Sequence, residues 1–169
     1  MDKVMLGDQV TGPLGLVVTT PPTAGVRDLV RCPDALPSEG RAVAGKTTEW
    51  TWRGADGRVV EVRQYTAVYQ GVSGREVAKE ARAVSTCHQA ADETYYSNGG
   101  LPSTKKFVDD RFEYCERQLA DKHDTLCSVL LAKGDVVTAV TIHRTDDGDY
   151  TSVPQLKDFV PALTDQLFA

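Results

Sequence analysis

Two cysteine-bearing segments stand close together in Phe112–Leu131, FEYCERQLADKHDTLCSVLL. Each has the aromatic and β-branched residues, with partial alternation, that are typical of a β-strand. The polar run ADKHD between them is typical of a turn. A hairpin centred near Asp121 would place Cys115 opposite Cys127, close to the Cβ separation that a disulfide needs. The sequence therefore predicts a β-hairpin closed by a Cys115–Cys127 disulfide.

The chain has two further cysteines, Cys32 and Cys87. If the hairpin pair forms, Cys32 remains for Cys87, and two disulfides indicate an oxidising compartment. Two alternatives stay open at this point. One is four reduced, buried thiols in a cytosolic protein, and the other is a zinc site built from Cys87, Cys115, Cys127 and His123. No C-x-x-C occurs, so the usual spacing of a zinc or redox pair is missing.

A strand pair is predicted on the N-terminal side of this hairpin. The segments 47–52 and 58–70 are rich in strand-forming residues, and the turn cluster Gly54–Gly57 separates them. Trp50 and Trp52 are two residues apart, so they share one face of their strand, where we expect a helix to pack.

Helices are predicted on both sides of the cysteine hairpin. Ser73 and Glu76 have the spacing of a capping box, and an apolar stripe through Val77 and Ala81 follows them. After the hairpin come a turn at Lys133-Gly134, an apolar strand over 136–143 and an apolar-faced helix at the C-terminus.

This order of elements indicates an α+β fold. We expect one antiparallel sheet of about five strands, with the helices packed on one face and two disulfides. We expect a single domain over residues 1–169, in which an irregular N-terminal segment, 1–30, precedes the α+β part, 31–169.

Composition and charge narrow the class of protein. The 169 residues include 24 acidic and 19 basic side chains, a net charge of -5, which argues against a nucleic-acid-binding surface. No apolar run reaches the roughly 18–20 residues that span a bilayer. Asp2 and Lys3 follow Met1 and no apolar signal region comes after them. We therefore expect either a cytoplasmic protein or a processed domain.

No catalytic motif is recognisable. The chain lacks the spacing of a catalytic triad, a nucleophile elbow, a phosphate-binding glycine loop and H-E-x-x-H, so we predict no catalytic residue, metal or cofactor. Charged residues within a predicted strand, a pair of tyrosines in a long loop and the histidine after the last apolar strand are candidates for a ligand cleft. These are Asp109, Asp110, Arg111, Tyr95, Tyr96 and His143. A solvated sheet face and ordinary loop packing are the competing interpretations.

The layout of residues 30–169 resembles a known family. It comprises an early loop with Cys32, a strand with Trp50 and Trp52, a helix ending in Cys87, the cysteine hairpin, a further strand and a C-terminal helix. This pattern is similar to the actinobacterial extracytoplasmic sensor domains that are attached to the receptor Ser/Thr kinase PknH and that also occur as cell-envelope lipoproteins. The resemblance implies disulfides in sequential order, a central ligand cleft and no catalysis; the lipobox cysteine of such lipoproteins is absent from this chain.

We accordingly expect an extracytoplasmic, non-enzymatic, sensor-like domain that binds a small ligand or a cell-envelope protein. It would contact no nucleic acid, and a membrane only through a tether that precedes the chain. One alternative is an interaction or inhibitor module that uses Trp50, Trp52 or the Tyr95–Leu101 loop. Another is a small α+β pocket enzyme, which would need a His–Asp pair such as His143 with Asp110.

Overall fold

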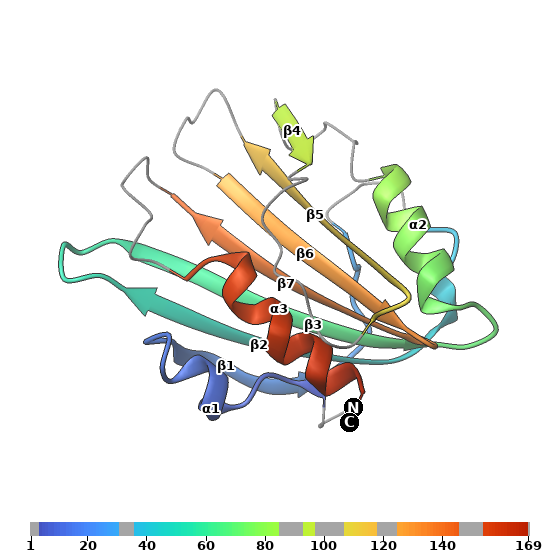
Figure 1. Ribbon diagram of the computed structural model, residues 1–169, viewed down its shortest axis with the longest axis horizontal. Helices are drawn as coiled ribbons and strands as arrows, with labels where there is room; N and C mark the ends of the chain where they lie inside the picture. The colour runs from blue at the N-terminus through green and yellow to red at the C-terminus, as the bar shows by residue number, and fades with distance from the viewer. Residues whose placement is uncertain are drawn as a thin grey trace.

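The computed structural model describes residues 4–30, 36–84, 93–96, 107–117, 125–145 and 154–168. Its strands form one seven-stranded antiparallel sheet in the order β1-β2-β3-β7-β6-β5-β4 (Figure 1). The strands are β1 (Val17–Ala24), β2 (Ala42–Arg53), β3 (Val59–Tyr69), β4 (Glu93–Tyr96), β5 (Asp110–Arg117), β6 (Thr125–Lys133) and β7 (Val136–Arg144). The helices are α1 (Asp8–Thr11), the 3-10 turn η2 (Glu39–Arg41), α2 (Gly74–Val84) and α3 (Leu156–Leu167). The α+β class is confirmed.

The expected strand count was too low, because both edges carry a strand that the sequence pattern did not define. On one edge, β1 lies in the segment 1–30 that we expected to be irregular, and it pairs with β2. On the other edge, β4 lies where we expected a loop, and it pairs with β5. The prolines Pro21 and Pro22 lie within β1, which agrees with the restriction of proline to edge strands.

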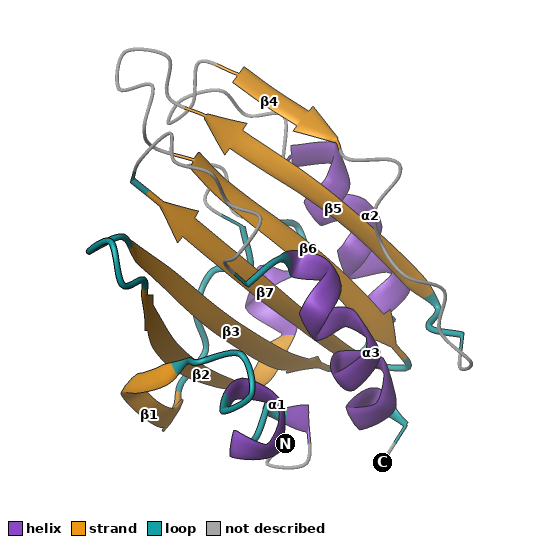
Figure 2. Cartoon of the chain, turned by 60° about the vertical axis from the view of Figure 1, so that its left-hand side comes forward, coloured by secondary structure: helices purple, strands orange, loops and turns teal. Residues whose placement is uncertain are grey.

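The two long helices lie on opposite faces of the sheet, so the expectation of helices on one face was wrong (Figure 2). Side chains alternate along a strand, and β6 shows both environments. Leu130 and Ala132 pack with α2, whereas Val129 and Leu131 pack with α3. We call these two surfaces of the sheet the α2 face and the α3 face. A strand buried on both faces is apolar throughout, which explains the nearly continuous apolar runs of β6 and β7.

The start of α2 is the capping box that the sequence predicts. The backbone N–H of Glu76 donates to Ser73 Oγ at 3.2 Å, and the backbone N–H of Ser73 donates to the Glu76 carboxylate at 2.9 Å. These hydrogen bonds satisfy backbone donors that the helix itself leaves unpaired. The Ser73 bonds also lower the pKa of Glu76. The predicted apolar stripe is confirmed at Val77 and Ala81, which are fully buried.

The cysteine hairpin has the predicted register. Cys115 lies directly opposite Cys127 in the β5–β6 pair, and a disulfide joins them across a Cα–Cα distance of 4.1 Å. This bond excludes the zinc alternative that needs both thiols as ligands. The predicted Cys32–Cys87 disulfide lies outside the described residues.

The N-terminal segment is held to the α3 face by a buried amide. Gln64, which is fully buried, accepts a hydrogen bond from the backbone N–H of Leu6 at 2.8 Å and donates to the carbonyl of Val4 at 2.7 Å. Its amide also donates to the hydroxyls of Thr66 and Thr138. Every polar atom of Gln64 therefore has a partner, as a buried amide requires.

Candidate functional site

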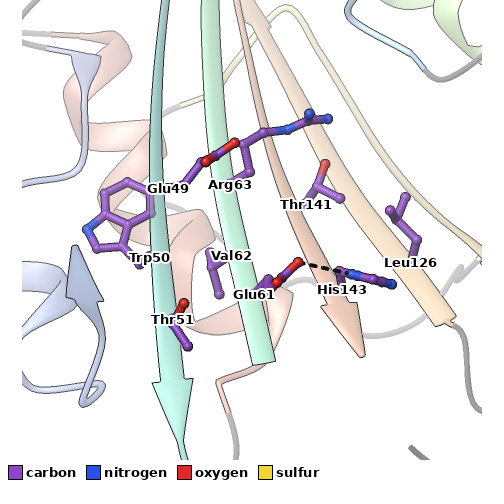
Figure 3. Close-up of a pocket in the computed structure, with 9 residues that line it drawn as sticks. All are labelled: Glu49, Trp50, Thr51, Glu61, Val62, Arg63, Leu126, Thr141 and His143. Atoms are coloured by element: carbon purple, nitrogen blue, oxygen red, sulfur yellow. Dashed lines mark hydrogen bonds and ion pairs between the residues drawn. The ribbon is translucent and has the colours of Figure 1, made fainter. Parts of the chain in front are cut away.

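A pocket of about 200 Å³ lies on the α2 face, over strands β2, β3, β7 and β6 (Figure 3). Its lining side chains on that face are Glu49, Thr51, Glu61, Arg63, Leu126, Thr141 and His143. Trp50 and Val62 also border it, although their side chains belong to the core under α3. The pocket is smaller than the roughly 300–1,000 Å³ of drug-sized sites, so it suits a small molecule.

Strand register assembles this lining from residues far apart in the chain. Glu49, Arg63 and Thr141 lie side by side across β2, β3 and β7. The next row consists of Thr51, Glu61, His143 and Leu126, across β2, β3, β7 and β6. Because side chains two apart share a face, the two rows form one polar surface about 7 Å from row to row.

Within the part of the chain that the structure describes, the cover on the α2 face stops partway along the strands, and the pocket lies where it stops. The row beyond Arg63 contains Tyr65, Ala139 and Leu130, which are buried beneath α2 and the residues Leu29, Val30 and Leu36. Along β3 the side chains on this face therefore change from a buried tyrosine to an arginine and then to an exposed glutamate. The polar end of the face is the part that these elements leave uncovered.

Hydrogen bonds order several of the lining groups. His143 Nδ1 lies 3.2 Å from a carboxylate oxygen of Glu61, whose side chain is 68% exposed. The hydroxyl of Thr20, on β1, donates to the Glu49 carboxylate at 2.7 Å. The hydroxyls of Ser128 and Thr141 are hydrogen-bonded at 2.9 Å. The lining thus offers two carboxylates, one guanidinium, one imidazole and two threonine hydroxyls to a ligand.

Of the six cleft residues predicted from sequence, the pocket contains His143. Asp109 accepts hydrogen bonds from the Lys133 ammonium and the Gly134 backbone at the β6–β7 turn, and these lower its pKa. Asp110 pairs with Arg82 of α2 at 2.9 Å. These aspartates were expected in mid-strand, but β5 begins only at Asp110.

The remaining candidates lie away from the pocket. Arg111 is opposite Leu131 in the sheet and therefore belongs to the α3 face. Tyr95 and Tyr96 lie on the edge strand β4. Tyr96 shares the row of Thr141, three strands away, which corresponds to about 14 Å.

Two specific expectations of the alternative functions are wrong: the pairing of His143 with Asp110, and a surface that uses Trp50. His143 shares a row with Glu116, whereas Asp110 lies six residues before Glu116 on β5, so His143 and Asp110 are about 20 Å apart. They form no acid–base pair. Trp50 is 2% exposed beneath α3, so it offers no surface to a protein partner. Packing of the tryptophan strand against a helix is confirmed.

Sequence reasoning missed five charged or polar lining residues: Glu49, Thr51, Glu61, Arg63 and Thr141. For Glu61 and Arg63, the signal was the change from apolar to charged residues at alternate positions of 61–65, within a strand that is otherwise strongly apolar.

No protein-family model matches the chain, and the search of curated proteins found no significant match. Among the described residues, no helix combines the length and the apolar character needed to cross a membrane.

Proposed function

We propose that the chain is an extracytoplasmic, non-enzymatic, sensor-like domain that binds a small polar ligand in the pocket on the α2 face. The observation that carries the proposal is the partial cover of that face. Among the described residues, it leaves two rows of polar and charged side chains around a volume of about 200 Å³, next to the core beneath α2. A few convergent polar groups in a concave site are typical of ligand recognition.

A binding role accounts for this lining better than catalysis does. The closest acid–base pair in the pocket, Glu61 with His143, lies at the rim, and Glu61 is 68% exposed. Such an exposed carboxylate is solvated and is not enclosed in a water-excluding site, where a charged group acts most strongly on a reacting substrate.

The extracytoplasmic part of the proposal is supported by the Cys115–Cys127 disulfide, because disulfides persist mainly in oxidising compartments. The resemblance to extracytoplasmic sensor domains is consistent with it, and a lipid anchor or secretion would place the domain there. Alkylation of the denatured, unreduced protein, followed by mass spectrometry, tests this part. We expect no labelled thiol and a Cys32–Cys87 peptide pair; four labelled thiols would contradict the compartment.

Ligand binding is tested by NMR with ¹⁵N-labelled protein and a panel of small acids, amines, zwitterions and sugars. We expect at least one class of compound to shift the amides of residues 49–51, 61–63 and 141–143 together. A panel that leaves these amides unmoved, or that shifts only amides elsewhere, would overturn the pocket as the binding site.

A further inference from the structure

The pocket has opposite charges at alternate positions of one strand. Arg63 and Glu61 are two residues apart on β3 and share the α2 face, so their Cα atoms are about 7 Å apart. Both side chains point from β3 toward β7, Arg63 toward Thr141 and Glu61 toward His143 (Figure 3). A ligand above β7 therefore meets a cation at one end and an anion at the other.

Each of the two groups keeps capacity for a ligand. The guanidinium has five N–H donors, so Arg63 can serve a ligand carboxylate in addition to protein acceptors. The Glu61 carboxylate uses one oxygen toward His143, and its exposed side chain leaves further acceptor positions for an ammonium group.

The surrounding charges oppose an anion more than a cation, because the lining has two carboxylates and one guanidinium. An anion at Arg63 would also face Glu49, its neighbour across the strand pair, and Glu61. A cation at Glu61 would face Arg63. A molecule with both charges places each one beside its opposite.

Size and apolar surface agree with a short linker between the two charges. The volume of about 200 Å³ admits only a small molecule. Leu126, in the row of Glu61 and His143, supplies an apolar surface for methylene groups.

We propose that the pocket binds a small zwitterion of the amino-acid class, with its carboxylate on Arg63 and its ammonium on Glu61. This inference rests on the proposed ligand-binding function and specifies its ligand class. The spacing of the two protein charges favours a compound whose own charges are separated by a few methylene groups.

The test uses γ-aminobutyrate as the zwitterion, with butyrate and butylamine as analogues that lack one charge each. All three are titrated into ¹⁵N-labelled protein at low ionic strength, because salt screens such pairs. We expect γ-aminobutyrate to shift the amides of residues 61–63 and 141–143, with each analogue at least about threefold to fivefold weaker, as the loss of one exposed ion pair implies. Equal binding of butyrate or butylamine would overturn the inference.

Substitutions test which protein residue binds each charged end of the zwitterion. Arg63→Gln and Glu61→Gln should each weaken γ-aminobutyrate binding about threefold to fivefold and bring its affinity to that of the matching analogue. Arg75→Gln on α2 and Asp8→Asn on α1 remove the same charges at exposed positions away from the pocket and should leave binding unchanged. Equal losses in the control variants would show a general charge effect and contradict the assignment.

Failure of the inference is distinguishable from failure of the proposed function. If γ-aminobutyrate leaves the pocket amides unmoved while another compound of the panel shifts them, the zwitterion is wrong and the binding pocket stands. If no compound shifts them, both fall.

Discussion

The two faces of the sheet use the same strands but differ in what covers them. On the α3 face, α3 supplies large side chains, among them Phe159 and Leu163, and the N-terminal segment adds Leu6 and Leu16. On the α2 face, the helix supplies the small side chains of Val77, Ala78 and Ala81. Its cover ends before the two rows that contain Arg63 and Glu61.

This difference separates the part of the sheet that stabilises the fold from the part that holds the candidate site. Where the cover is complete, even a polar residue such as Gln64 is buried, and every one of its polar atoms is paired. Where the cover is incomplete, arginine and glutamate stay partly or fully exposed, so the strands carry them at a lower desolvation cost. The candidate site lies on the less covered face, which is where a ligand can enter.

The largest expected effect is the loss of a side chain from the closed face. Phe159→Ala should lower the free energy of unfolding by about 3–5 kcal/mol, because it opens a cavity in a fully buried site. Val77→Ala, the matched change in α2, removes fewer buried atoms and should cost about 2 kcal/mol. Urea denaturation measures both, and equal losses would show that the two helices contribute alike.

A second change tests a constraint that depends on neither helix. Replacing Cys115 and Cys127 together by serine should lower the free energy of unfolding by about 3 kcal/mol, since the bond restricts the unfolded chain. The circular dichroism of the sheet should stay the same. A loss below about 1 kcal/mol would mean that strand pairing alone fixes the hairpin.

The buried amide gives a smaller effect that is specific to the α3 face. Gln64→Leu leaves the N–H of Leu6 and the carbonyl of Val4 without partners and should cost about 1–3 kcal/mol. Hydrogen exchange should become faster at residues 4–6. Thr141→Val, which breaks a half-exposed hydrogen bond on the α2 face, should cost less than about 1 kcal/mol. A larger cost for Thr141→Val would reverse the contrast between the faces.

The smallest effect concerns the cover on the α2 face, where the pKa of Glu39 is raised by desolvation and by the neighbouring Asp28 carboxyl. Ionisation of Glu39 is therefore easier in the unfolded chain, so it lowers stability as the pH rises through the raised pKa. Glu39→Gln should stabilise the protein slightly near neutral pH and have no such effect well below the ordinary value of 4.5. Denaturation midpoints across this range measure the difference, and a pH-independent effect would contradict it.

The local elements were predictable because their signals are short-range. The Ser73–Glu76 capping box and the opposition of Cys115 to Cys127 depend on residues within one turn or one hairpin. The placement of the helices was not predicted correctly, although the apolar runs of β6 and β7 already indicated burial on both faces.

The pocket was largely hidden because register across strands, rather than neighbourhood in the chain, assembles it. Arg63 meets Thr141 only through the β3–β7 pairing. Charged residues at alternate strand positions have the same pattern as an ordinary solvated face, so sequence alone does not distinguish the two. Asp109–Arg111 were predicted to border a cleft because their charges were expected within a strand, but β5 starts among them.

The strand order has a consequence for how the chain folds. Among the described strands, β1-β2-β3 and β4-β5-β6-β7 are two meanders of successive neighbours, and the β3–β7 pairing alone joins them. Each meander can form from contacts that are close in sequence, whereas the β3–β7 pairing requires the closure of a long loop. We expect the β3–β7 pairing to limit the folding rate. Substitutions in this strand pair should therefore slow refolding more than equally destabilising substitutions in the edge strands β1 and β4.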